Sequence, residues 1–226
     1  MSIPVTGFDC ESTGTDVATD RMVSAAIIER AADGSMTSHQ WLIDPGIEVP
    51  ASAVAIHGLT TQALRAHGEQ PPVALDEIAN LLASSLNLGI PILIYNASFD
   101  LRILAAELAR YQLESLDERL HSPVRPVFDP LVLDRGADRY RKGGRRLPDL
   151  METYRLSPAA HLHDATDDVI NTIAVFDAIM GQHPDLPTDP MDLHDWQIAA
   201  HREWATHYNQ WLAKQGRQPS AQVEWP

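Results

Sequence analysis

Four acidic residues and one histidine, arranged in three short motifs, are the side chains in this sequence that could do chemistry together. They are Asp9 and Glu11, then Asp100, and finally His163 with Asp168. Carboxylates from separate segments that converge on one point bind hard divalent cations, and a nearby histidine supplies a base. Such a set predicts hydrolysis of a phosphodiester by metal-activated water.

The first motif, Phe8–Gly14, ends an apolar segment. Residues i and i+2 of a β-strand project from the same face, so Asp9 and Glu11 point together while Cys10 points into the opposite layer. The two carboxylates lie about 7 Å apart along the strand and repel each other unless a cation sits between them. The turn that follows consists of Ser12, Thr13 and Gly14. Its free N–H groups could hold a phosphate, although an isolated pair of this kind also fits a solvated strand face.

The second motif, Asn96-Ala97-Ser98-Phe99-Asp100, follows a wholly apolar segment and begins a helical pattern. Ligand sites gather at such junctions of strand and helix in α/β sheets. Ser98 or Asp100 could instead serve as a helix cap. Capping and metal binding are compatible, so the motif supports both interpretations.

The third motif runs from His163 to Asp168. Asp167 and Asp168 fall in the first turn of a predicted helix, where acidic residues suit the helix dipole whatever their function. His163 lies just before this helix, where an imidazole could reach a site that faces Asp168. The chain has ten histidines, so His163 gains meaning only from the acidic residues around it.

The composition limits the class of protein. The chain has 226 residues, of which 44% are apolar and 21% charged, as in soluble globular proteins. A single cysteine allows no internal disulfide and fits a reducing compartment. No apolar run approaches membrane-spanning length, and no secretory signal is recognisable. We therefore expect a cytoplasmic protein with no membrane partner.

The net charge of −14 opposes general attraction to a polyanion. Two bound divalent cations would add four positive charges at the site. The segment Arg139–Arg146 also contains five basic residues and no acidic one. It could bind the phosphates of a nucleic-acid strand. The alternative is that it is a solvated loop.

The pattern of apolar residues predicts an α/β fold. Strands are expected over Val5–Cys10, Met22–Arg30 and Met36–Ile43 as an antiparallel meander, and over Ile90–Tyr95 and Val127–Asp129. A short helix should follow His57–Thr60, capped by Thr60 or Thr61. Further helices are expected over Val73–Leu88, Phe99–Tyr111, Pro130–Tyr140, Leu147–Tyr154 and Ala165–Met180. Strands followed by alternating strands and helices indicate a mixed sheet covered by helices.

The chain divides into a main domain over residues 1–182, a proline-rich connector over 183–190, and a C-terminal amphipathic helix and tail over 191–226. The helix is expected over Met191–Gln215 and the loose tail over Gly216–Pro226. One stripe of the helix carries Leu193, Trp196, Ala200, Trp204, Tyr208 and Trp211. The stripe is expected to pack on the main domain. Docking of a partner, such as a polymerase or a second copy, is the alternative.

In order and spacing, the three motifs resemble those of the DEDDh 3′–5′ exonucleases, the DnaQ-like family that includes the proofreading subunit of bacterial DNA polymerase III. The match to F-D-x-E-[ST]-T-G, N-A-x-F-D and H-x₄-D covers the whole catalytic set. The sister branch has tyrosine four residues before the last aspartate, where this chain has Asp164. The resemblance extends over about residues 4–180, including the segments Leu42–Pro45 and Ala55–Thr60. It implies a ribonuclease H-like mixed five-stranded sheet flanked by helices, with a C-terminal helical extension.

The resemblance also implies a mechanism. Two Mg²⁺ or Mn²⁺ ions would be held by Asp9, Glu11, Asp100 and Asp168, with Asp9 bridging them. Glu11 and Asp168 would complete the ion that carries the attacking water, and Asp100 would hold the second ion. His163 would take the proton from that water. The products would be nucleoside 5′-monophosphates released from single-stranded 3′ ends, with DNA favoured over RNA.

The expected substrate contacts are Ser12, Thr13, Gly14, His57, Asn96, Phe99, Arg141, Lys142 and Arg145. An RNA exonuclease similar to oligoribonuclease or RNase T is the alternative within the enzyme class. A non-catalytic scaffold in a replication complex is the alternative outside it, and the intact catalytic set argues against it. A DNA polymerase partner and the oligomeric state are left open.

Overall fold

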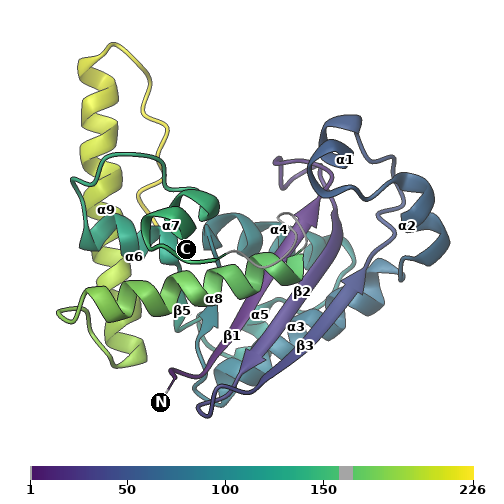
Figure 1. The fold of residues 1–226 in the computed structure, drawn as a ribbon. Helices are drawn as coiled ribbons and strands as arrows, with labels where there is room; N and C mark the ends of the chain where they lie inside the picture. The colour runs from purple at the N-terminus through teal and green to yellow at the C-terminus, as the bar shows by residue number, and fades with distance from the viewer. Residues whose placement is uncertain (1, 158–164) are drawn as a thin grey trace.

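A mixed five-stranded sheet forms the centre of the molecule (Figure 1). The computed structural model describes residues 2–157 and 165–226. The strand order is β3-β2-β1-β4-β5, with β1, β2 and β3 antiparallel and with β4 and β5 parallel to β1. The strands are β1 (Val5–Ser12), β2 (Met22–Arg30), β3 (Met36–Leu42), β4 (Ile92–Leu93) and β5 (Val127–Phe128). The predicted meander and mixed sheet are therefore confirmed.

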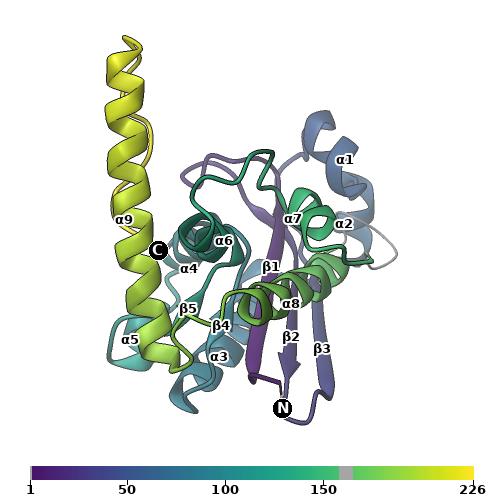
Figure 2. The same cartoon turned by 60° about the vertical axis from the view of Figure 1, so that its left-hand side comes forward.

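Helices cover both faces of the sheet (Figures 1 and 2). One face packs on α3 (Pro71–Asn87), α4 (Ala97–Arg110) and α5 (Leu116–Leu120), and the other packs on α7 (Leu147–Thr153) and α8 (Ala165–Gln182). The remaining helices are α1 (Ala51–His57), α2 (Thr61–His67), α6 (Pro130–Ala137) and α9 (Pro190–Lys214). Within the described residues, none of these helices combines the length and the apolar character that crossing a membrane would require.

The sequence explains the layering. Strand β2 is buried on both faces, so its apolar residues do not alternate with polar ones, whereas the edge strand β3 is mostly exposed. Helix α3 begins with two prolines, which suit a first turn, and buries one apolar stripe that includes Leu75, Ile78 and Leu82. This stripe is the one that helical spacing predicts.

Several short elements differ from the prediction. Strand β4 covers only Ile92–Leu93 of the expected Ile90–Tyr95, because the chain turns into α4 directly after the sheet. Helices α1 and α5 were not predicted, since one or two turns give too few residues for a helical period to be recognised. Helix α6 ends at Ala137 rather than Tyr140.

Helix α9 closes the edge of the sheet beside β5 (Figure 2). Gln197 is fully buried, where its Oε1 accepts the Asp129 N–H at 2.7 Å and its Nε2 donates to the Val127 carbonyl at 3.0 Å. His194 Nδ1 accepts the Val127 N–H at 3.2 Å. These side chains satisfy backbone groups that a sixth strand would otherwise pair. Packing of the helix on the main domain is thus confirmed for its first half.

The segment after α9 returns along the helix and is ordered by it. Asn209 Oδ1 accepts the N–H groups of Ser220 and Ala221 at 3.1 and 3.0 Å. The Trp225 side chain is only 5% exposed and lies 5.6 Å from the His194 ring, centroid to centroid. The expectation of a loose tail is wrong because this tryptophan buries its large apolar surface against α9.

Replacing Gln197 with leucine should destabilise the fold. The change leaves the Asp129 N–H and the Val127 carbonyl buried with one partner fewer, at about 1–3 kcal/mol for each group. We expect a lower free energy of unfolding in urea than for Gln210→Leu, a control at an exposed position of the same helix. Equal stability of the two variants would show that α9 does not support the β5 edge.

Candidate active site

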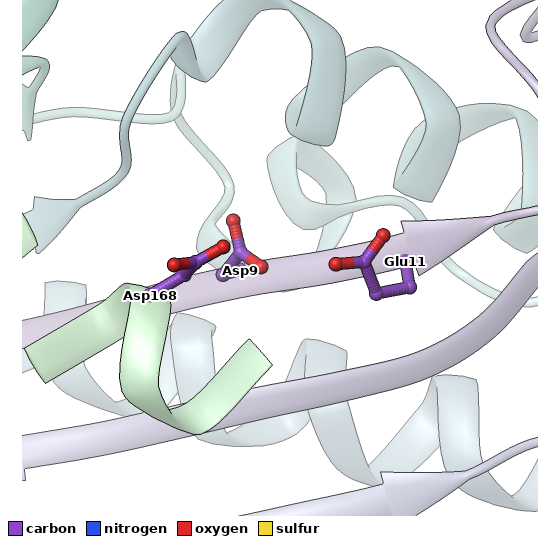
Figure 3. Close-up of side chains that lie close together, drawn as sticks. All are labelled: Asp9, Glu11 and Asp168. Atoms are coloured by element: carbon purple, nitrogen blue, oxygen red, sulfur yellow. The ribbon is translucent and has the colours of Figure 1, made fainter. Parts of the chain in front are cut away.

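Three carboxylates converge where β1 meets the start of α8. Asp9 and Glu11 lie on one face of β1, and Asp168 lies in the first turn of α8. One carboxylate oxygen from each residue lies within 4.8 Å of those of the other two. Figure 3 shows the three side chains gathered above the strand. This is the spacing at which one cation could contact all three.

The close approach of α8 depends on a glycine in β1. A Cβ atom at Gly7 would lie 2.4 Å from Val169 Cγ1, so any larger residue there would push the helix off the strand. Val169 follows Asp168 directly in α8. Gly7 therefore sets the distance between Asp168 and the carboxylates of β1.

Asp100 reaches the same site from α4 on the other side of β1. Its Oδ1 accepts the Cys10 N–H and contacts Cys10 Sγ, both at 3.2 Å. Strand β4 pairs with β1 only at Thr6 and Gly7, so the edge of β1 beyond that point is open to this side chain. Asp100 is 4% exposed. As expected, Cys10 lies in the layer opposite to that of Asp9.

A buried aspartate that the sequence analysis missed fixes the start of α4. Asp129 accepts the N–H groups of Asn96 and Ala97, each at 3.0 Å, and also the N–H of Leu131 at 2.9 Å. It therefore caps both α4 and α6, whereas the sequence left Ser98 or Asp100 as the alternative cap of α4. Asn96 adopts a left-handed backbone with φ of 63°, which asparagine tolerates better than most residues.

The crowded carboxylates change one another's acidity. Burial, followed by the charges of Asp100, Glu11 and Asp168, raises the pKa of Asp9 well above its usual range. Burial raises the pKa of Asp100 to about 7, against the lowering effect of its hydrogen bonds from Cys10. Both shifts mean that the site favours positive charge, whether it is a proton or a cation.

These carboxylates open into a cleft of about 570 Å³. Its other walls are apolar, polar and basic, and they come from α4, α6 and the segment before α7. They include Tyr95, Asn96, Phe99, Leu131, Arg145, Arg146, Leu147 and Pro148. The expected contact residues Asn96, Phe99 and Arg145 thus lie in the same cleft as the acidic set.

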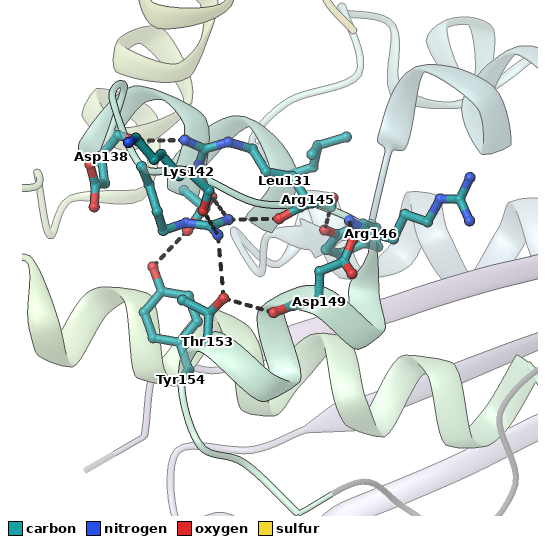
Figure 4. Close-up of polar contacts among 12 residues, drawn as sticks. Leu131, Asp138, Lys142, Arg145, Arg146, Asp149, Thr153 and Tyr154 are labelled. Atoms are coloured by element: carbon teal, nitrogen blue, oxygen red, sulfur yellow. Dashed lines mark hydrogen bonds and ion pairs between the residues drawn. The ribbon is translucent and has the colours of Figure 1, made fainter.

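The basic segment has a buried anchor. Asp134 is fully buried in α6 and forms ion pairs with Arg141, at 3.0 Å, and with Arg145, while the Tyr154 hydroxyl donates to it at 2.9 Å (Figure 4). Arg141 and Arg145, which were expected to contact the substrate, therefore also have a structural partner. Lys142 is exposed and is not among the residues that line the cleft.

Arg146, which is not among the expected contact residues, is the more exposed of the two arginines that line the cleft. Its side chain extends away from the Asp134 network in Figure 4 and lines the cleft beside Arg145. Its backbone N–H donates to Asp149 at 2.8 Å, which fixes the start of α7. The sequence of Arg139–Arg146 does not indicate which of its five basic residues faces the site.

The turn after β1 is held by its own hydrogen bonds. The Thr13 N–H donates to the Arg21 carbonyl at 2.9 Å, and its hydroxyl donates to Asp20 at 2.8 Å. A Cβ atom at Gly14 would lie 2.5 Å from the Asp20 carboxylate. The Thr13 N–H is therefore not one of the free N–H groups of this turn, and the expected substrate contacts of Ser12, Thr13 and Gly14 stay a prediction.

His57 lies on the other side of Glu11. It ends α1 and lines a second cavity of about 400 Å³ with Glu11, Trp41 and Leu59, among others. Its Nδ1 accepts the Leu59 N–H at 3.1 Å, which places the proton of the neutral ring on Nε2. Partial burial lowers the pKa of His57, and the backbone of Ser12 partly offsets this effect. His163, the expected base, lies outside the described residues.

Comparisons with known proteins agree with this geometry. The RNase T family model, described as "Exonuclease", matches residues 6–176. A search of curated protein sequences finds no match. Among solved structures, E. coli Exonuclease I with a dT13 oligonucleotide is 22% identical with a TM-score of 0.67, over 82% of this chain and 42% of that chain. The zinc-bound complex of E. coli ExoI with single-stranded DNA is 23% identical with a TM-score of 0.70, over 94% and 45%.

This chain spans less than half the length of those structures, and at such identity the likeness shows a shared fold. The fold is the ribonuclease H-like exonuclease fold, with a mixed five-stranded sheet, flanking helices and a long C-terminal helix. The family match covers most of the 226 residues. The chain therefore belongs to the RNase T family of exonucleases.

Proposed function

We propose that this chain is a metal-dependent 3′–5′ exonuclease that releases nucleoside 5′-monophosphates from single-stranded DNA. The observation that carries the proposal is the convergence of Asp9, Glu11 and Asp168 within 4.8 Å, in a cleft that Asp100 also lines. The family match over residues 6–176 supports the reaction class. The oligonucleotide complexes of E. coli Exonuclease I support single-stranded DNA as the substrate.

The donor set fits Mg²⁺ or Mn²⁺. Every donor is a carboxylate oxygen, as hard divalent cations prefer. Burial raises the pKa of both Asp9 and Asp100, and neighbouring carboxylates raise that of Asp9 further, so a bound cation would stabilise the ionised groups. Asp9, Glu11, Asp168 and Asp100 would hold the ions. When bound, they would activate the attacking water and stabilise the leaving 3′ oxygen.

Other side chains would transfer the proton and bind the substrate. His163 takes the proton from the attacking water, a role that rests on the H-x₄-D motif and on the suitability of an imidazole near neutral pH. Arg145 and Arg146 face the phosphates from the opposite wall of the cleft. Phe99 and Leu147 supply apolar surface for the terminal nucleotide.

The cavity beside His57 offers a second pocket for the terminal nucleotide. It adjoins the catalytic cleft at Glu11 and combines the apolar Trp41 and Leu59 with the polar Gln40. His57 can donate from Nε2, because Nδ1 already accepts a backbone N–H. A polymerase partner rests on the family resemblance alone.

The direct test uses matched DNA and RNA strands labelled at either end. With Mg²⁺ or Mn²⁺, we expect a 3′-terminal label to appear at once as a mononucleotide, while a 5′ label yields a descending ladder. EDTA should abolish both. Asp9→Ala should lower the rate by about 10³-fold or more, and His163→Ala by about 10²–10⁴-fold, as expected for loss of a general base.

Asp185→Asn, at an exposed position after α8, is the control for a lost negative charge. Activity that persists in EDTA, or release from the 5′ end, would contradict the proposal. Faster cleavage of RNA than of DNA would keep the mechanism and change the substrate.

The metal-free protein should lose stability as the pH rises. In the folded state, Asp100 has a pKa of about 7 against an unfolded value near 3.8, so the folded state binds more protons between these values. This contribution, on the order of a few kcal/mol, is full below pH 4 and is lost as the pH rises through 7. We expect the Tm in EDTA to fall between pH 5 and 8.

Mg²⁺ competes with protons for the carboxylates, so it should raise the Tm more at pH 8 than at pH 5. Asp100→Asn should flatten the EDTA curve relative to the charge-matched Asp185→Asn. Stabilisation by Mg²⁺ that is equal at both pH values would argue against binding by these groups.

Arg146→Ala should weaken substrate binding more than catalysis. Loss of a charge-assisted phosphate contact should raise KM about tenfold and leave kcat nearly unchanged. The control is Arg65→Ala, which removes the same charge from an exposed position in α2. The KM and kcat of both variants are measured by steady-state kinetics on the same DNA strand. Equal KM values would show that Arg146 does not bind the substrate.

A further inference from the structure

More than half of the basic residues of this acidic chain lie in two segments. Residues 134–146 and 196–217, here called the basic face, contain nine of the 17 Lys and Arg residues and three of the 31 acidic ones. The basic members are Arg135, Arg139, Arg141, Lys142, Arg145, Arg146, Arg202, Lys214 and Arg217. The acidic ones are Asp134, Asp138 and Glu203, and Arg202 pairs with Glu224 of the tail. A polyanion could bind here despite the net charge of −14.

The two segments form one surface because α6 packs on α9. The Arg135 guanidinium lies 3.6 Å from the centroid of the Trp204 ring, and Arg139 forms an ion pair with Glu203. Gly136 makes the contact close, since a Cβ atom there would lie 2.5 Å from the Trp196 ring.

A row of aromatic rings runs along this surface. Trp204, Tyr208 and Trp211 occupy one stripe of α9, with centroids 5.4 and 5.8 Å apart and interplanar angles of 11° and 24°. The tail lies along another side of the helix, where Ala205 and Leu212 are buried. The Trp211 ring remains 49% exposed. Single-stranded nucleic acids bind to surfaces of this kind, where bases stack on exposed aromatic rings and phosphates contact basic side chains.

The basic face continues into the catalytic cleft. Arg145 and Arg146 belong to both. A cavity of about 230 Å³ shares Asn96 and Leu131 with the cleft and also borders Trp204. Figure 1 shows the chain between α6 and α7 passing from the side of α9 toward the sheet. A single-stranded nucleic acid whose 3′ end enters the cleft could thus extend past basic residues as far as α9.

We propose that the basic face and the aromatic row bind the single strand upstream of the scissile bond. This rests on the exonuclease function proposed above and adds a second contact region to it. Phosphates contact the arginines between the cleft and α9, and bases stack on the exposed Trp211 at the end of the aromatic row. A second copy of the chain fits less well, since a two-fold interface would set this basic face against its own copy.

The test compares Trp211→Leu with Trp211→Phe. Both keep an apolar side chain at an exposed position, and only phenylalanine stacks on bases. We expect Trp211→Leu to raise the Kd for fluorescein-labelled dT16 in EDTA about tenfold, and Trp211→Phe to stay near wild type. The KM for dT3 in Mg²⁺ should be unchanged in both, because a trinucleotide occupies only the cleft.

Met36→Ala, at an exposed apolar position on β3, is the control. Unchanged dT16 affinity in Trp211→Leu would overturn the proposal. A changed sedimentation coefficient in that variant without DNA would overturn it in favour of a second copy. Because binding is measured without metal, it remains informative if no hydrolysis occurs, whereas absent cleavage of dT3 and dT16 by wild type would count against the exonuclease function itself.

Discussion

The crowding of carboxylates in a partly enclosed cleft is the constraint around which this molecule is built. The pKa of Asp9 is raised first by removal from water and then by the charges of Asp100, Glu11 and Asp168. Such a cluster costs stability unless protons or cations balance it. The fold holds the acidic groups together by placing them on three separate elements, β1, α4 and α8, each fixed by its own apolar contacts. Rigid support of this kind preorganises a metal site.

A single buried carboxylate links the active site to the C-terminal helix. Asp129 fixes the first turn of α4, which carries Asp100, and also caps α6. Its own N–H donates to Gln197 of α9. Gln197 of α9 is thus linked through Asp129 to the first turn of α4, the helix that carries Asp100. Helix α9 is part of the framework of the active site, whichever ligand its outer surface binds.

The sequence predicted the main elements and the acidic set for clear physical reasons. Strand alternation placed Asp9 and Glu11 on one face, and the strand–helix junction placed Asp100 at the same edge. These are local rules. The cap at Asp129 could not be predicted, because it joins a strand end to a helix start 32 residues earlier. The hydrogen bond of Thr13 to Arg21 and the burial of Trp225 likewise depend on partners that only the folded chain supplies.

The uneven charge distribution resolves the conflict between a chain of net charge −14 and a polyanionic substrate. At physiological ionic strength, charges more than about 8 Å away are largely screened at exposed positions. A single-stranded nucleic acid beside α6 and α9 would therefore be attracted by the nearby arginines more than it is repelled by acidic residues elsewhere on the surface. The carboxylates of the cleft are the exception, since in the proposed reaction they would meet the scissile phosphate directly. Their negative charge can be offset only at the same point, by protons or by bound cations, which is why the raised pKa values of this site and its capacity to hold a metal have one cause.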